Sequence, residues 1–181
     1  MGVGTILLII LAVVVVLIAT YNGLITLNNR VKEAASDIDV QLKRRFELIP
    51  NLVNTVKGYA THEKELFTKV TEERAGLMKG STADKLAASN QMTDTLKSLF
   101  AVAENYPDLK ANENFLQLQA DLTDTQDKIM SAQRFYNANV RDFNTNIQVF
   151  PTNMYAKQLG FTAYEMIEAT EGEKANVEVK F

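Results

Sequence analysis

Residues 3–19 read VGTILLIILAVVVVLIA, and thirteen of these seventeen side chains are Ile, Leu or Val. Near the centre of a bilayer each such residue contributes roughly −0.3 to −0.6 kcal/mol, so the run favours insertion by about 4 to 8 kcal/mol. With residues 20–23 it reaches the ~20 residues that cross ~30 Å of hydrocarbon. Tyr21 lies where an aromatic side chain suits the membrane–water interface. We therefore expect residues 1–23 to be a transmembrane anchor that contacts the lipid bilayer through residues 3–23.

Two other interpretations of this run are a cleaved signal peptide and a buried core helix. A signal peptide has a basic segment before its apolar part and a cleavage site with small residues. Here no Lys or Arg precedes the run, and Leu17-Ile18-Ala19 places a large residue where a small one is preferred. The helical pattern also continues beyond residue 20. An uncleaved anchor is the preferred interpretation.

The 181-residue chain has one His, no Cys and a net charge of −3. Its length suits one domain of ordinary size. The absence of Cys excludes disulfides, thiol nucleophiles and Cys-ligated metals. The single His excludes any site that needs two histidines of one chain. The net charge gives no sign of a basic surface, so we predict no nucleic-acid partner.

Charged side chains are absent from residues 1–29 and begin with Arg30 and Lys32. The excess of cations after the run favours a cytoplasmic C-terminal domain, and hence a single-pass protein of the bacterial inner membrane. The bias is weak, because the first cation lies about ten residues, or ~15 Å of helix, beyond the apolar run.

A helical pattern follows the anchor directly. Apolar or small side chains recur every three or four residues, which is the spacing of one helix face. Gly23 alone interrupts the join, so we expect the anchor and the first bundle helix to be continuous. Pro50 lacks a backbone N–H, and we expect a kink near residues 46–50. The face consists of Leu24, Leu27, Val31, Ala34, Ile38, Leu42, Phe46, Ile49, Val53, Val56 and Ala60.

Three further helices are predicted from their start signals. Thr61 is expected to cap the second helix, and Ser81 or Thr82 to cap the third, with Asp84 in its first turn. Pro107 suits the first position of a fourth helix, which then continues for about 40 residues. The fourth helix is rich in amides, which either fix the register of the packed helices or form a network between helices or subunits. These amides are Asn137, Asn139, Asn144 and Asn146.

Helices joined by short turns run antiparallel to their neighbours. Residues 24–151 are therefore predicted to form an antiparallel helical bundle. The predicted fold class is all-α, with an N-terminal transmembrane helix continuous with that long antiparallel bundle.

The C-terminal residues, 152–181, are expected to form short helices and a tail, interrupted at Gly160. Their larger side chains either rest on the lipid interface or cap the bottom of the bundle, and the cap is preferred. These side chains are Tyr155, Phe161, Tyr164 and Met166. Residues 177–181 alternate between apolar and charged side chains, and either add a lone strand or stay loose.

No group of residues in the sequence has the spacing of a catalytic, cofactor-binding or metal site. His62 opens a helix, where a surface His is common. Asp37 and Asp39 lie ~200° apart around a helix, and the inward-facing Glu-x-x-His pairs of bundle metal sites are absent. Residues 43–45, Lys-Arg-Arg, are interpreted as a solvated face, with a contact to a subunit or partner as the alternative. We predict no catalytic residue, no cofactor and no metal.

Several motifs together resemble the bacterial LemA family. They are the anchor with Tyr21-Asn-Gly-Leu, Arg45-Phe-Glu-Leu-Ile-Pro-Asn-Leu-Val53, Tyr106-Pro-Asp-Leu-Lys-Ala-Asn-Glu-Asn-Phe115, Ala132-Gln-Arg-Phe-Tyr-Asn137, Phe150-Pro151, Gly160-Phe161 and a final Val-Lys-Phe. The resemblance covers essentially the whole chain. It implies a membrane-anchored helical bundle and no enzymatic activity, and some relatives are associated with the formation of intracellular membranes.

The leading functional hypothesis is a non-enzymatic, membrane-anchored bundle that acts by homo-oligomeric assembly, with an effect on membrane organisation or shape. The alternative is an adaptor that recruits or regulates another membrane or envelope protein. A third hypothesis is an enzyme or ligand carrier with a site inside the bundle. If copies assemble, the contacts are expected from apolar residues outside the helix faces. The candidates are Leu48, Leu52, Leu109 and Leu116.

Overall fold

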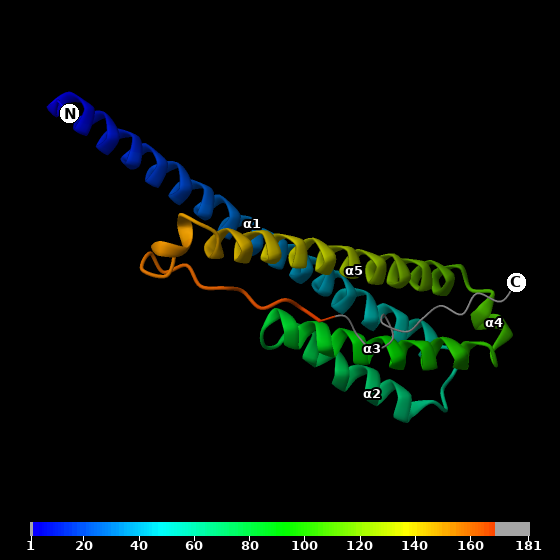
Figure 1. The fold of residues 1–181 in the computed structure, drawn as a ribbon. Coiled ribbons are helices and arrows are strands. Elements are labelled where there is room, and N and C mark those ends of the chain that lie inside the picture. The colour runs from blue at the N-terminus through cyan, green and yellow to red at the C-terminus, as the bar shows by residue number, and fades with distance from the viewer. Residues whose placement is uncertain (1, 169–181) are drawn as a thin grey trace, which may run out of the picture. The chain divides into compact units, whose positions relative to one another are not determined.

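The computed structural model describes residues 2–168, and this part of the chain consists of helices and connecting turns without a strand (Figure 1). The all-α prediction is therefore confirmed. The elements are α1 (Val3–Lys57), α2 (Lys64–Arg74), the 3-10 helix η1 (Ala75–Met78), α3 (Thr82–Ala103), α4 (Pro107–Lys110), α5 (Glu113–Gln148) and the 3-10 helix η2 (Thr152–Met154). Residues 177–181, expected either to add a lone strand or to stay loose, lie outside the described residues.

The first helix is continuous over 55 residues. It joins the apolar run to the bundle without a break, as the uninterrupted helical spacing predicts. It ends at Lys57, directly before Gly58. Pro50 lies inside the helix and does not end it.

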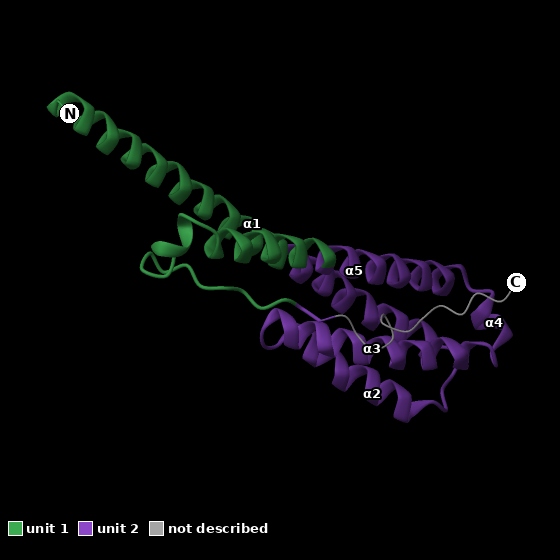
Figure 2. Ribbon diagram, in the orientation of Figure 1, with its two compact units in different colours: residues 1–35, 134–166 green, residues 36–133, 167–181 purple. Residues whose placement is uncertain are grey.

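The chain forms two compact units, and α1 and α5 each contribute to both (Figure 2). The first unit contains residues 1–35 and 134–166. The second contains residues 36–133 and, of the described residues, 167 and 168. Each unit has its own apolar core.

The second unit is an antiparallel bundle of the end of α1, α2, α3 and the start of α5 (Figure 1). Its core contains the apolar face that the sequence pattern predicts, including Ile49, Val53 and Val56. The other helices contribute Phe67, Val70, Leu77, Met92, Leu96, Leu99, Leu109, Phe115 and Leu122.

The start of α3 confirms one predicted cap. The Ser81 hydroxyl accepts a hydrogen bond from the Asp84 N–H at 3.2 Å, and the Asp84 carboxylate accepts one from the Ser81 N–H at 2.9 Å. The Ser81 hydroxyl also donates to the Asp84 carboxylate at 2.7 Å. This hydrogen bond and the one from the Ser81 N–H hold the pKa of Asp84 below its ordinary value. Gly80 precedes the cap with a φ of 82°, and a Cβ there would lie 2.7 Å from an Asp84 oxygen. Glycine is therefore required at this turn.

One predicted helix start is wrong, and one predicted helix is divided in two. Thr61 lies in a turn, and α2 begins three residues later with Glu63 at its N-cap and no side-chain cap. Pro107 opens a short helix, as predicted, but α4 ends at Lys110. The Asn112 side chain accepts a hydrogen bond from the Phe115 N–H at 3.0 Å and so starts α5 separately. The single fourth helix is divided because an asparagine in this position caps a new helix.

Candidate functional site

The apolar run at the start of α1 is exposed along its length. Its most apolar window has a mean hydropathy of 3.1 and no buried residue. Among its large side chains, exposure ranges from 43% at Leu17 to 76% at Val3. By length and composition the helix can cross a membrane. A buried core helix is excluded, because such a helix would be mostly covered by protein.

The C-terminal segment packs against α1 directly after this run, within the first unit. The hydroxyl groups of Thr20 and Tyr155 form a hydrogen bond across 135 residues of sequence. The rings of Tyr21 and Phe161 lie 6.1 Å apart. The core of this unit consists of Leu24, Val31, Val140, Phe143, Ala156 and Phe161. Residues 20–31, the end of α5 and residues 155–164 thus form one packed structure.

Asn144 on α5 secures this segment. Its side-chain nitrogen donates to the Tyr164 carbonyl at 2.8 Å, and its side-chain oxygen accepts from the Tyr164 N–H at 3.0 Å. The Tyr164 hydroxyl donates to the Asn28 side-chain oxygen of α1 at 2.8 Å. A side-chain amide here replaces the backbone partner that residue 164 would have in a sheet. Of the predicted amides, Asn144 therefore forms a tertiary connection, whereas Asn139 and Asn146 bond to carbonyls four residues earlier in α5.

The large C-terminal side chains named in the sequence analysis divide between core and surface. Phe161 is buried in the first unit, and Tyr164 packs against its core. Met166 is 51% exposed. The segment contains one short 3-10 helix, η2, and Gly160 interrupts the chain with a φ of 83°. The residues from 161 to 168 are not helical.

The basic cluster at residues 43–45 is divided: Lys43 and Arg44 are exposed, as predicted for a solvated face, whereas Arg45 is 2% exposed. Its guanidinium donates to the Ser89 carbonyl at 3.1 Å, the Ser89 hydroxyl at 2.7 Å, the Gln126 side-chain oxygen at 2.5 Å and the Thr93 hydroxyl at 2.9 Å. Burial lowers the pKa of Arg45 to about 10, which leaves the group charged at neutral pH. Arg44 faces Asp121 and Asp124 instead, at 3.8 and 3.5 Å.

A groove of about 220 Å³ borders Arg45 on the second unit. Thr93, Gln119 and Gln126 provide polar atoms, and Leu96 and Phe100 are among its apolar residues. The groove combines a buried cation with neutral hydrogen-bonding groups and with the charged side chains of Lys97 and Asp127. Its lining contains no histidine that could serve as the base for a Ser, Thr or Lys nucleophile.

The other sequence candidates lie apart from this groove. His62 is exposed in the turn before α2. Asp39 pairs with Lys85 at 2.9 Å, whereas Asp37 is exposed. Within residues 2–168, no three His, Cys, Asp or Glu side chains gather as a metal site would require.

Three of the four apolar residues expected at an assembly surface belong to the core instead. Leu52 and Leu109 are fully buried, and Leu48 packs against the same core. Leu116 is 48% exposed. The helix faces that pack in the second unit are wider than the faces predicted from the sequence. Leucines expected outside those faces are therefore part of the core.

The burial of Arg45 can be inferred from its spacing to apolar residues, although its neighbours in the basic cluster suggest an exposed position. Leu42 lies three residues before it and Ile49 four residues after it, and both are buried. A residue with that spacing to both lies on the inner face of the helix. The Thr20–Tyr155 contact has no comparable signal, since it joins segments far apart in sequence.

Comparison with known proteins finds relatives that match most of the chain. The sequence pattern of the LemA family matches residues 34–181. Protein LemA of Metamycoplasma hominis is 29% identical over 160 residues, which cover 87% of this chain and 73% of the relative. Magnetosome protein MamQ of Magnetospirillum gryphiswaldense is 25% identical over 183 residues, covering 86% and 67%. Magnetosome protein MamQ 2 of Paramagnetospirillum magneticum is 25% identical over 186 residues, covering 88% and 68%.

The matched region contains all six motifs on which the resemblance rests beyond the anchor, from Arg45–Val53 to the final Val-Lys-Phe. It extends over most of the chain. The helical architecture of the described residues agrees with what the resemblance implies. This chain belongs to the LemA family.

Proposed function

We propose that the protein is a non-enzymatic, single-pass protein of the bacterial inner membrane that acts by assembling with copies of itself. One observation carries the proposal: α1 continues unbroken from an exposed apolar run into a packed helical unit. A bilayer that holds the run aligns neighbouring copies and raises their effective concentration. Assembled copies organise the membrane that they occupy.

In this proposal, copies contact each other first through their anchor helices. On the second unit, the large apolar side chains that are exposed, Val40, Tyr59, Met78 and Leu116, come from four different elements or turns, and scattered exposure of this kind is ordinary for a protein surface. The anchor instead presents an apolar surface over its whole circumference. Helices in a bilayer associate through close packing of such surfaces.

Disulfide crosslinking in native membranes tests this assembly, because the chain has no cysteine of its own. Single cysteines introduced one at a time at residues 10–13 scan the circumference of the anchor. Oxidation is expected to link copies strongly at one or two of these positions. Ala103→Cys is the matched control and should give no crosslink, since residue 103 is 2% exposed.

Monomers at every anchor position, at native expression levels, would contradict assembly. If a photo-crosslinker at the same positions then captures a different membrane or envelope protein in equal amount, the adaptor function replaces the proposal. Capture of the protein's own chain alone supports assembly.

The proposed cytoplasmic orientation rests on the cations that begin at Arg30. Ser98→Cys provides a reporter, because residue 98 is exposed on α3. A maleimide that cannot cross membranes should leave it unlabelled in spheroplasts and label it after lysis. Labelling of intact spheroplasts would place the bundle on the outer side.

A further inference from the structure

The turn that follows α5 presents an apolar surface that the core does not use. Residues 149–159, here named the apolar turn, expose Val149 (46%), Phe150 (78%), Met154 (67%) and Leu159 (48%). Phe150 is thus more exposed than any large side chain in the apolar run, where Val3 is highest at 76%. A cluster of this kind marks an interaction surface more often than a solvated one.

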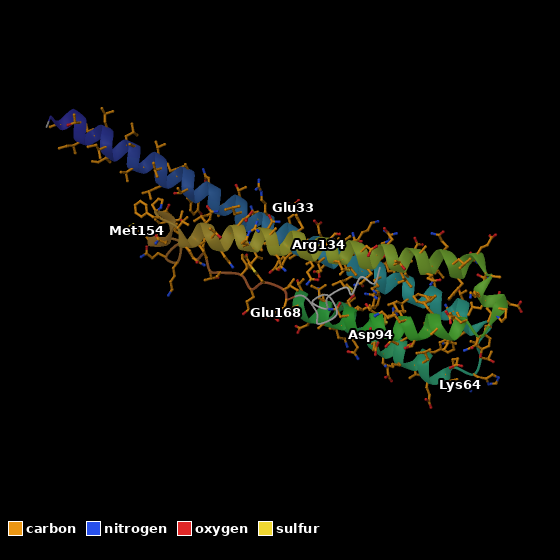
Figure 3. All side chains as sticks on the ribbon, turned by 45° about the vertical axis from the view of Figure 1, so that its right-hand side comes forward. Glu33, Lys64, Asp94, Arg134, Met154 and Glu168 are labelled. Carbon is orange, nitrogen blue, oxygen red and sulfur yellow. The ribbon has the colours of Figure 1, made fainter. Side chains whose placement is uncertain are left out.

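The first unit holds the apolar turn beside the end of the anchor. Tyr155 contacts Thr20, the residue that follows the run, and Ala156 is buried in the same core as Leu24. Figure 3 shows Met154 in the turn that follows α5, with α1 passing above it. The seventeen residues of the run extend ~26 Å along the helix, which approaches the thickness of the hydrocarbon layer. When the run spans a bilayer, the apolar turn lies at the boundary between hydrocarbon and headgroups.

The distribution of charge agrees with this position. Residues 143–164 contain one charged side chain, Lys157, whereas the chain average of 23% predicts about five in such a stretch. Residues 1–29 contain none. Two segments remote in sequence are therefore both depleted of charge, and the fold brings them together. Lys157 is exposed, and a lysine with an apolar stem and a charged end suits the phosphates of anionic lipids.

We propose that the apolar turn docks into the lipid interface next to the anchor, with Phe150 and Met154 at the level of the upper acyl chains and Lys157 at the phosphates. The inference rests on the proposed single-pass topology. It gives the protein a second attachment to the same leaflet. Because interfacial anchors set the tilt and rotation of a membrane helix, the turn restricts how α1 leaves the bilayer.

Tryptophan fluorescence tests the docking, because the chain contains no Trp. Phe150→Trp and Met154→Trp each introduce one reporter into the full-length protein. The variants are reconstituted in phosphatidylcholine–phosphatidylglycerol vesicles whose acyl chains carry bromine near the headgroup. We expect both to lose emission relative to unbrominated vesicles. Phe135→Trp is the matched control and keeps its emission, since residue 135 is 53% exposed but lies ~22 Å earlier along α5.

Leu11→Trp separates failure of this inference from failure of the anchor. If Leu11→Trp is quenched by bromine deep in the acyl chains but Phe150→Trp and Met154→Trp are not quenched at any depth, the docking is wrong and the anchor stands. If Leu11→Trp is not quenched, the membrane topology itself fails. A third outcome is a Phe150→Trp emission that is blue-shifted but not quenched, and that returns to longer wavelength when added vesicle lipid dilutes the protein. This result shows that a second copy covers the turn, and it also overturns docking to lipid.

Discussion

At the scale of single residues, Arg45 is a cation held in the second unit by neutral oxygen atoms. Desolvation of a guanidinium is costly, and hydrogen bonds must compensate for it. Ser89, Thr93 and Gln126 supply four such bonds to its terminal nitrogens, while Nε is buried without a partner. Arg45 therefore connects α1 to α3 and α5 and specifies how these helices align.

Arg45→Met is expected to lower the free energy of unfolding by about 1–3 kcal/mol, because the oxygens that surround the guanidinium lose their donors in a buried place. Arg45→Lys should also destabilise, since one ammonium group cannot reach all of these acceptors. Urea unfolding of the detergent-solubilised full chain, followed by circular dichroism, measures both effects. Arg44→Met is the control and should change stability by less than ~1 kcal/mol, as its pairs are exposed. Equal stability of Arg45→Met and the natural protein would refute the assigned role.

At the scale of elements, the proline inside α1 has a specific partner. Pro50 lacks an N–H, so the Phe46 carbonyl loses its usual helical donor. Arg74 of α2 donates its Nε–H to this carbonyl at 2.9 Å, and its guanidinium stacks 3.6 Å from the Phe46 ring. The helix stays continuous because a neighbouring helix supplies the missing hydrogen bond.

A double-mutant cycle tests this compensation. Arg74→Ala alone is expected to destabilise the protein by about 1–2 kcal/mol, through the lost hydrogen bond and the lost ring contact. In a Pro50→Ala background the cost should fall, because the restored N–H of residue 50 bonds to the Phe46 carbonyl. Unfolding free energies of the four proteins give the coupling. Additive effects would show that Arg74 acts through the ring contact alone.

The start of α3 should respond to acid. The pKa of Asp84 is lowered in the folded protein, so its hydrogen bonds stabilise the fold above the ordinary value of 3.8 and are lost as the pH falls through the lowered value. Asp84→Asn is expected to be less stable than the natural protein at pH 7, with a difference that shrinks below pH 3.8. Thermal unfolding across this range measures it. In a Ser81→Ala background the effect of Asp84→Asn should become smaller, and an unchanged effect would argue against the capping box.

At the scale of the whole molecule, each unit is closed by contacts between segments distant in sequence. In the first unit, Asn144 holds residue 164 by two hydrogen bonds, and Tyr164 reaches Asn28. In the sequence, the apolar turn lies between Asn144 and Tyr164, the two residues that these hydrogen bonds join. Its position beside the anchor therefore depends on the attachment of residue 164.

Asn144→Leu is expected to raise the hydrogen-exchange rate of the Tyr164 amide by about tenfold or more, because its acceptor is removed. Asn144→Asp keeps an acceptor for that amide and should have a smaller effect. Asn146→Leu is the control, since Asn146 is exposed and bonds within α5. Exchange followed by mass spectrometry at residue resolution measures all three. Protection that survives in Asn144→Leu would contradict the attachment.

The apolar run, the continuity of α1, the all-α fold and the cap at Ser81 could be predicted from the sequence. These features depend on hydrophobicity and on residues within one or two helical turns, and the division of α4 from α5 at Asn112 is equally local. The burial of Arg45 among its partners, the bond from Arg74 to Phe46 and the contact of Tyr155 with Thr20 are visible in the folded chain alone. The partners of Arg45 lie 44 to 81 residues away, and Tyr155 lies 135 residues from Thr20. Such contacts follow from how whole helices pack, because each depends on the position of elements that local spacing does not specify.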